Sequence, residues 1–495
     1  MKYTLGYDIG SSSIKAALLD IATGKPVATA FSPQNEMLIN SPQPGFAEQD
    51  PDKWWDELIN ATAQLRSITS FKGEEIAAIG ISYQMHGLVC IDKHHKPLRP
   101  SIIWCDSRAV DIGNKAFHDL GEEFCLQRFL NSPGNFTASK LKWVKDNEPE
   151  LYKSIHKIML PGDYIALRLT GEASTTISGL SEGILWNFQE EGVATELLKD
   201  YGISEELLSD LVPTFGEQGR LTDVAASTLS LKSGIPVSYR AGDQPNNAFS
   251  LNVLNPGEIA ATAGTSGVVY GVIDKVAYDS QSRVNNFVHV NHNKSAPRYG
   301  VLLCVNGTGS LNNWLRKNFF SSLSYQQINE EAAMIPIGSD GVKFYPFGNG
   351  AERVLANSDP GAMLQNLQFN RHHRGHVARA AQEGIVFALR YGMEIMEEMG
   401  LRMKTIRAGY ANMFLSEVFA STFANTTGCV IELYNTDGAV GAARAAGVGA
   451  GIYPDFASSF KGMDLIRKIE PVKEQVQPSQ EAYNNWKNYL SKHIV

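Results

Sequence analysis

The alternation of apolar and polar residues at the start of the chain predicts short strands joined by tight turns. Residues 2–10 alternate with the period of a half-buried strand, and apolar segments at 14–20 and 26–31 predict two more. A turn of small hydroxyl residues follows the first strand, so Asp8 lies at a strand end. Backbone N–H groups and hydroxyls in such a turn can hold a phosphate, but taken alone the segment fits an ordinary surface hairpin better.

A second hairpin with the same character lies just past the midpoint. Residues 257–272 place the turn Gly264-Thr265-Ser266 between two apolar strands. Two such hairpins, one opening each half, indicate an internal duplication. The pattern resembles the actin, hexokinase and Hsp70 superfamily, whose duplicated α/β, ribonuclease H-like domains bind the two ends of a triphosphate across a central cleft. At 495 residues the chain is too long for one core, and we expect domains at 1–248 and 249–495.

Between the hairpins the pattern predicts a helix over a buried strand. Asp50 suits an N-cap, Pro51 the first helical position, and apolar residues then recur at helical spacing. Residues 76–82 form a nearly continuous apolar run, typical of a strand buried on both faces, and residues 88–91 resume a strand.

Polar residues follow two of the predicted buried strands. His86 interrupts the first, where an isolated histidine is more often a satisfied core residue. Asp243 follows apolar residues and Gly242, in a loop where an acid is more often a turn residue. Position at the end of a central strand favours ligand contact for His86, whereas a role for Asp243 rests on the neighbouring motifs.

Composition narrows the partners and the compartment. The formal charge of −8, with no long Lys/Arg block, argues against nucleic acid as the main partner. Five scattered cysteines without CxxC or zinc-type spacing indicate reduced thiols, so we expect a cytoplasmic protein. The chain enters a strand at once and has no apolar run of bilayer-spanning length, so neither secretion nor a membrane partner is expected.

Several familiar sites are missing or weak. Neither a Walker A loop nor a Gly-x-Gly-x-x-Gly dinucleotide fingerprint occurs. His372, His373 and His376 are close together, but without a placed carboxylate or thiolate we interpret them as solvated residues at a helix start.

Together, motifs over most of the chain resemble the FGGY family of carbohydrate kinases. Gln84-Met85-His86-Gly87 is similar to the sugar-binding motif of the family's xylulokinases. Other stretches that resemble the family are residues 44–55, 99–108, 137–147, 160–171, 237–248, 346–353 and 406–415. This chain departs from the pattern at Cys105, where asparagine is common, at Gly162, where lysine is usual, and at Ala408, which replaces a glycine.

The resemblance implies roles for the acids and for a sugar site. Asp243 would be the general base, and Asp8 would orient Mg²⁺ through water. The implied sugar-binding residues are Gln84, Met85, His86, Trp104 and Gln244.

It also implies an ATP site drawn from both halves, with Mg²⁺ at the phosphates. The implied residues are Ser11, Ser12, Ser13, Lys15, Gly264, Thr265, Ser266, Gly307, Trp314, Gly409 and Asn412. For Trp314 a core position is an equal alternative. A helix of small residues at 437–447 is expected to pack beneath the nucleotide site.

The implied activity is that of a carbohydrate kinase, a phosphotransferase that converts D-xylulose and ATP to D-xylulose 5-phosphate. Ribulose, sedoheptulose, gluconate and glycerol remain alternative substrates. A regulator that binds sugar or ATP without catalysis remains an alternative of another class, although retention of Asp8 and Asp243 speaks against it. A homodimer is left open.

Overall fold

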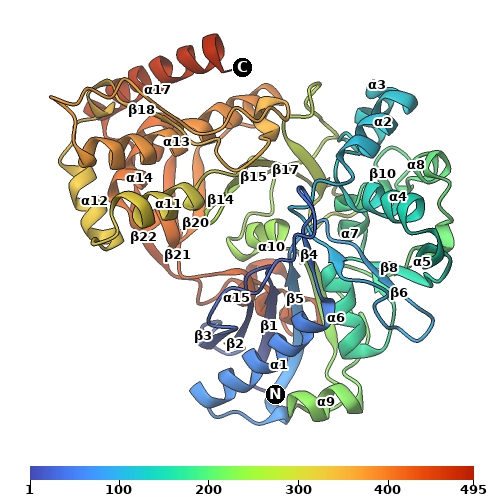
Figure 1. The fold of residues 1–495 in the computed structure, drawn as a ribbon. Helices are drawn as coiled ribbons and strands as arrows, with labels where there is room; N and C mark the ends of the chain where they lie inside the picture. The colour runs from blue at the N-terminus through green and yellow to red at the C-terminus, as the bar shows by residue number, and fades with distance from the viewer. Residues whose placement is uncertain (495) are drawn as a thin grey trace. The chain divides into compact units, whose positions relative to one another are not determined.

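The computed structural model describes residues 1–494, which form two compact units (Figure 1). The first unit contains Met1–Asn252, Phe287–Tyr299 and Thr436–Met463. The second contains Val253–Asn286, Gly300–Asn435 and the chain from Asp464 onward. Two late segments therefore belong to the same unit as the N-terminal half.

In its described residues the first unit is built on a five-stranded sheet with the order β13-β5-β1-β2-β3. The strands are β1 (Tyr3–Ile9), β2 (Ile14–Asp20), β3 (Pro26–Ser32), β5 (Ile76–Tyr83) and β13 (Val237–Gly242). Strands β1, β2 and β3 pair antiparallel, whereas β5 runs parallel to β1 and to β13. All residues of β5 and β13 are buried, as the apolar run at 76–82 predicts.

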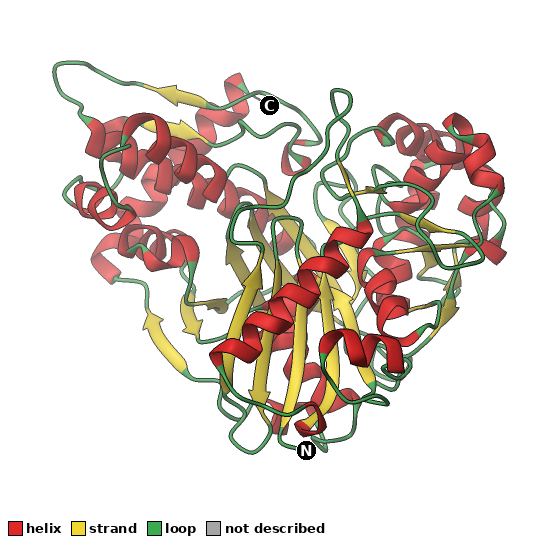
Figure 2. Cartoon of the chain, turned by 60° about the horizontal axis from the view of Figure 1, so that its bottom comes forward, coloured by secondary structure: helices red, strands yellow, loops and turns green. Residues whose placement is uncertain are grey.

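Helices cover both faces of this sheet. Helix α1 (Pro51–Ile68) begins as predicted, with the Asp50 side chain accepting a hydrogen bond from the Asp52 N–H at 3.0 Å, and it crosses the strands in the centre of Figure 2. Alternate residues of β2 face the opposite side, where Ala17 and Leu19 pack against helix α15 (Gly438–Gly449).

The small-residue helix α15 packs closely on the first sheet. It lies on β1 and β5 of the same unit. A Cβ atom at Gly6 would lie 2.0 Å from the Ala439 carbonyl oxygen, and one at Gly80 would lie 2.1 Å from the Ala442 oxygen. Glycines in the strands and small residues in the helix therefore allow backbone contact.

A second sheet repeats the arrangement of the first. Its order is β16-β17-β15-β14-β20-β21-β22 over the described residues. The strands are β14 (Ile259–Ala263), β15 (Gly267–Ile273), β16 (Asn285–Val288), β17 (Tyr299–Val305), β20 (Thr405–Gly409), β21 (Val430–Tyr434) and β22 (Leu465–Ile469). As with β1, β2, β5 and β13, an antiparallel hairpin (β14, β15) is followed by two parallel strands (β20, β21). The duplicated α/β fold is thus confirmed.

Smaller elements complete each unit. In the first they are β4 (Glu48–Gln49), β6 (Val89–Ile91), β7 (Ser101–Ile102), α2 (Val110–Leu120), α3 (Glu122–Phe129), α4 (Thr137–Asn147), α5 (Pro149–Lys153), β8 (Lys157–Met159), α6 (Pro161–Thr170), β9 (Ser174–Thr175), α7 (Ile177–Glu182), β10 (Trp186–Asn187), β11 (Gly192–Val193), α8 (Thr195–Tyr201), β12 (Asp210–Leu211), α9 (Asp223–Leu229), α10 (Asp243–Ser250) and α16 (Phe456–Ser459). In the second they are α11 (Gly309–Phe319), α12 (Tyr325–Ala333), β18 (Lys343–Tyr345), β19 (Met363–Gln365), α13 (Arg374–Glu398), α14 (Glu417–Thr427) and α17 (Lys473–His493).

Two of the three histidines before and in α13 are not solvated as predicted, whereas His373 is exposed. The side chains of His372 and His376 are buried, and their ring centroids are 5.0 Å apart. The His373 Nδ1 accepts a hydrogen bond from the Gly375 N–H at 3.2 Å, and the His376 Nδ1 accepts one from the His373 N–H at 3.2 Å. The rings therefore cap the helix start.

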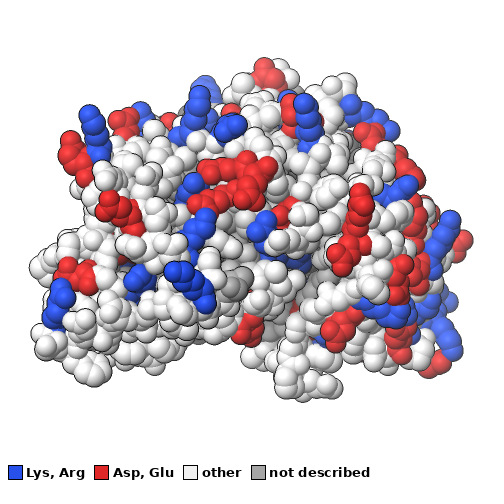
Figure 3. All heavy atoms as spheres, turned by 90° about the horizontal axis from the view of Figure 1, so that it is seen from above, with Lys and Arg blue, Asp and Glu red and all other residues white. Residues whose placement is uncertain are grey.

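Basic and acidic side chains are interspersed over the face seen in Figure 3, as expected for a sequence without a long Lys/Arg block. Among the helices of residues 1–494, none is both long and apolar enough to cross a bilayer.

Candidate active site

Three parallel strands bring the two predicted acids to one edge of the first sheet. The register pairs Asp8 with Ser82, and Ser82 with Ala241 on β13. Asp243 follows the end of β13, and Gln84 follows the end of β5. Carboxyl ends of parallel strands are a common place for ligand sites in α/β folds, and residues distant in the sequence meet here.

Asp8 is held beside the start of α15. Its Oδ1 accepts a hydrogen bond from the Ser82 hydroxyl at 2.9 Å, and a Cβ atom at Gly438 would lie 2.5 Å from its Oδ2. Burial is the main cause that raises the pKa of Asp8, opposed by Lys15 and by the Ser82 hydrogen bond. Lys15 pairs with Asp8 in the β1–β2 register. The helix N-terminus also favours a negative charge at this place.

Asp243 is the first residue of α10 and is half-buried. Burial raises its pKa to about 7, and the nearby Asp8 carboxylate adds to that rise. A carboxyl group with a pKa close to neutral pH can accept a proton from a substrate and still be ionised in much of the enzyme. Asp243 therefore has the chemistry of a general base.

Buried acceptor atoms without partners surround these acids. Within the described residues, Gln84 Oε1, Gln244 Oε1 and Glu182 Oε1 have no hydrogen-bond partner. Buried polar atoms in folded proteins are nearly always paired, so each such atom calls for an explanation. A ligand rich in hydroxyl groups supplies the donors that these oxygens lack.

The Met85-His86 segment lies in the same unit in an unusual conformation. His86 has φ of 62°, in the left-handed region, and its ring contacts Phe136 and Phe287 at centroid distances of 4.8 and 5.3 Å. Its Nδ1 donates to the Glu182 carbonyl oxygen at 2.9 Å. His86 is partly exposed.

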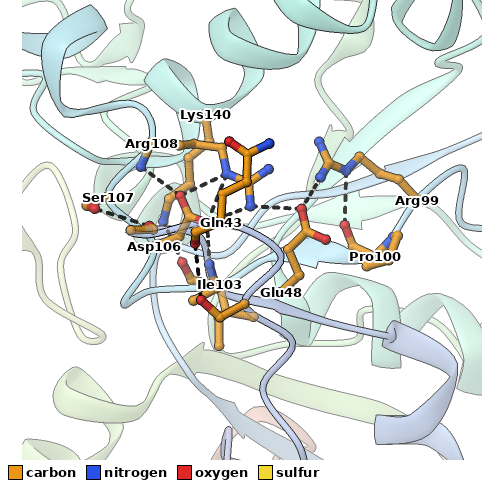
Figure 4. Close-up of polar contacts among 12 residues, drawn as sticks. Gln43, Glu48, Arg99, Pro100, Ile103, Asp106, Ser107, Arg108 and Lys140 are labelled. Atoms are coloured by element: carbon orange, nitrogen blue, oxygen red, sulfur yellow. Dashed lines mark hydrogen bonds and ion pairs between the residues drawn. The ribbon is translucent and has the colours of Figure 1, made fainter.

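A fully buried lysine, Lys140, contacts this segment; Figure 4 shows it beside Asp106 and Arg108. Lys140 Nζ donates to the carbonyl oxygens of His86 at 2.9 Å and Ile103 at 3.0 Å. Burial lowers the pKa of Lys140 to about 8. One side chain thus joins the histidine turn to the segment that precedes Trp104.

Buried ion pairs fix the Trp104 segment itself. Arg108 pairs with Asp106 at 2.7 Å and with Glu48 at 2.8 Å, and Glu48 also pairs with Arg99 (Figure 4). Trp104 is 39% exposed.

The Trp104 Nε1 donates to the Ser11 hydroxyl at 3.4 Å. In the same turn the Gly10 N–H donates to the Ser13 carbonyl at 3.1 Å, and Ser12 is exposed. A residue assigned to the sugar and a turn assigned to phosphate therefore lie side by side.

In the second unit the turn Gly264-Thr265-Ser266 lies near Gly409 and Asn412, two other predicted ATP residues. The Gly309 N–H donates to the Gly264 carbonyl at 2.8 Å, and the Ser310 N–H donates to the Thr265 carbonyl at 3.1 Å. A Cβ atom at Gly264 would lie 3.6 Å from Asn412 Nδ2. Gly409 ends β20, parallel to β14, and Ser266 completes the turn. These predicted ATP residues are grouped at one sheet edge.

Trp314 and Gly307 line a cavity of about 840 Å³ in the second unit. Trp314 is 50% exposed and contacts Phe319 at a centroid distance of 5.3 Å. The alternative of a core tryptophan is therefore wrong.

Three residues that touch the candidate residues have no role predicted from the sequence. Ser82 and Glu182 belong to no pattern that points to chemistry, and Lys140 lies inside the family-like stretch at 137–147 without a role assigned to it. For Glu182 a weak signal exists, since it is a single acid within the small and apolar run at 177–186.

The chain is similar to known proteins over most of its length. Residues 3–250 match the model of the N-terminal domain of the FGGY family of carbohydrate kinases, and residues 259–450 match its C-terminal domain. The chain is 30% identical to a xylulose kinase of Bacillus subtilis over 99% of its length and 96% of that protein. It is 29% identical to an L-xylulose/3-keto-L-gulonate kinase of Escherichia coli over 99% of its length and 97% of that protein.

Among solved structures, a xylulose kinase from Rhodospirillum rubrum superposes with a TM-score of 0.86 and 25% identity, over 99% of this chain and 98% of that one. The two family domains together span most of the sequence. The chain therefore belongs to the FGGY family of carbohydrate kinases.

Proposed function

We propose that the protein transfers the γ-phosphoryl group of ATP to the terminal hydroxyl of a ketopentose, D-xylulose, giving D-xylulose 5-phosphate and ADP. The observation that carries the proposal is the group at the carboxyl edge of the first sheet. There Asp243, with a pKa of about 7, lies beside buried, unpaired oxygens of Gln84 and Gln244. Xylulose kinases are among the full-length relatives.

Asp243 acts as the general base. Its carboxylate takes the proton of the primary hydroxyl as that oxygen attacks the γ-phosphorus of ATP. The new oxygen–phosphorus bond forms while the bond from the γ-phosphorus to the bridging oxygen breaks, so ADP leaves and Asp243 ends protonated. Little covalent work falls to the protein, and positioning with charge neutralisation supplies the rest of the catalysis.

Asp8 fits a site for Mg²⁺. Magnesium prefers oxygen ligands and usually keeps several waters, and the Asp8 carboxylate offers oxygens beside a hydroxyl and a helix N-terminus. Asp8 would hold the ion through water, and the bound ion would neutralise charge on the phosphates.

The remaining predicted residues bind the far end of the sugar and the ATP. Met85, His86 and Trp104 hold the end of the sugar away from the reacting hydroxyl. The ATP residues are Ser11, Ser12, Ser13 and Lys15 in the first unit with Gly264, Thr265, Ser266, Gly307, Trp314, Gly409 and Asn412 in the second.

An ADP-release assay over a panel of ketoses and polyols tests the proposal. The panel contains D-xylulose, L-xylulose, D-ribulose, sedoheptulose, gluconate and glycerol, with ATP and Mg²⁺ in excess. We expect the highest kcat/KM for D-xylulose. Clearly better turnover of glycerol or gluconate would move the assignment to another branch of the family, and no turnover of any compound would favour a regulator that only binds.

A further inference from the structure

Glu182 is a buried acid whose side chain has no role in the mechanism above. It ends α7 and is 1% exposed, and its Oε1 has no hydrogen-bond partner in the described part of the chain. Burial of an unpaired carboxyl oxygen is costly, on the order of 1–3 kcal/mol. A protein that keeps such an atom usually satisfies it with a ligand or an ordered water.

The position of Glu182 connects the two halves of the proposed acceptor site. Its backbone carbonyl accepts the hydrogen bond of His86 Nδ1 at 2.9 Å. A Cβ atom at Gly242, the residue before Asp243, would lie 2.5 Å from Glu182 Oε2 and 2.6 Å from Met85 Cγ. The carboxyl group therefore lies where the Met85-His86 segment meets the backbone that leads to the base.

Two buried cations lie near Glu182, and both have other partners: Lys140 donates to the carbonyl oxygens of His86 and Ile103. Arg240, the buried cation on β13, pairs with Asp163 at 3.0 Å. Burial raises the pKa of Glu182 well above its usual range, and the charges of Asp243 and Asp163 add to the rise, while the Tyr83 hydroxyl and the His86 backbone N–H beside the carboxyl oppose it. A carboxyl group in its neutral form offers one donor and one acceptor, the pair that a sugar hydroxyl complements.

We infer that Glu182 is a specificity-determining residue, whose carboxyl group hydrogen-bonds the ketose hydroxyl at the end opposite the one phosphorylated. This end follows from its contacts, because Glu182 is tied to His86 and Met85. In a ketopentose phosphorylated at C5, that hydroxyl is on C1. The inference rests on the proposed function, since it takes a ketose as the acceptor.

The test compares D-xylulose with 1-deoxy-D-xylulose, which lacks only the C1 hydroxyl. A site built to hydrogen-bond a hydroxyl rejects the analogue without it, so we expect the parent enzyme to prefer D-xylulose in kcat/KM by roughly 10–100-fold or more. Glu182→Ala should lower kcat/KM for D-xylulose by a similar factor and change that for 1-deoxy-D-xylulose by less than about threefold.

Two further variants separate recognition from structural support. Glu182→Gln keeps a donor and an acceptor, so it should retain the preference within about threefold. Ser178→Ala is the matched control, because Ser178 lies in the same helix and its buried hydroxyl donates to the Val288 carbonyl at 3.3 Å. This variant should lower the melting temperature and leave the preference unchanged.

The outcomes distinguish the two proposals. If Glu182→Ala lowers kcat/KM for both sugars alike, or if Glu182→Gln loses the preference as fully as Glu182→Ala, the inference on Glu182 is overturned while the kinase activity stands. If the parent enzyme phosphorylates no ketose at all, the proposed function itself fails.

Discussion

Replacing Asp243 by asparagine should cost activity and add stability, with a dependence on pH that identifies the cause. The folded-state pKa of Asp243 is raised from 3.8 to about 7, chiefly by burial. The folded protein thus binds this proton more tightly than the unfolded chain does. Ionisation of Asp243 therefore destabilises the folded protein. This destabilisation is absent at a pH below the pKa of Asp243 in the unfolded chain, grows as the pH rises, and is complete above its pKa in the folded protein.

The size follows from the shift. At about 1.36 kcal/mol per pH unit, a rise from 3.8 to about 7 corresponds to roughly 4 kcal/mol. Roughly 2.5 kcal/mol of this develops between pH 5 and pH 8. In a unit of this size that is a change in melting temperature of about 5 °C. Asp243→Asn has no titrating group at this position. The difference in melting temperature between this variant and the parent should therefore widen by that amount from pH 5 to pH 8.

Two measurements on the same samples check the prediction. Calorimetric melting at pH 5 and pH 8 gives the stability, and coupled ADP release with D-xylulose gives turnover. Turnover of Asp243→Asn should fall by roughly 10²–10⁴ because the base is lost, while sugar affinity by titration calorimetry changes much less. Asp210→Asn, which removes an exposed acid of the same unit, is the matched control and should change neither quantity. Near-normal turnover, or a melting advantage equal at the two pH values, would refute the reasoning.

Three other substitutions probe the remaining parts of the site. Asp8→Asn should raise the Mg²⁺ concentration for half-maximal turnover, and excess Mg²⁺ should recover part of its activity, unlike that of Asp243→Asn; identical magnesium titrations for the two variants would contradict the assignment. Lys140→Met removes the lysine that donates to the carbonyl oxygens of His86 and Ile103. It should lower the free energy of unfolding by about 2–4 kcal/mol and raise the KM for the sugar at least about tenfold. An unchanged KM would show that Lys140 does not support the sugar site. Gly309→Ala places a Cβ atom 2.2 Å from the Gly264 carbonyl oxygen and should raise the KM for ATP with sugar affinity unchanged; equal kinetics for the variant and the parent would show that this turn does not bind phosphate.

The sequence predicts most of the first sheet because its signals are local. The apolar run at 76–82 and the Asp50-Pro51 start of α1 need only neighbouring residues, and both are confirmed. Asp8 and Asp243 come together through the register of strands more than two hundred positions apart in the sequence. The family resemblance implied that these two acids share a site, but hydrophobic periodicity alone could not predict it.

Other features lie beyond any local signal. A run of small residues shows that α15 packs closely against something but not which sheet it covers. Glu182 was missed because its importance comes from the backbone of Gly242 and the ring of His86, not from its neighbours in sequence. His372 and His376 are buried, and their ring nitrogens accept backbone hydrogen bonds, a use that composition does not reveal.

The late position of α15 also constrains how the protein is made. The N-terminal sheet emerges from the ribosome long before residues 438–449, and until then the face of Ala17 and Leu19 has no cover. Domains usually fold in order during synthesis, but this unit cannot complete its core until residues 438–449 have been made. A nascent chain or a fragment that stops before residue 438 therefore exposes an apolar sheet face, a target for chaperones and proteases. For the same reason, residues 1–252 expressed alone lack a part of their own unit.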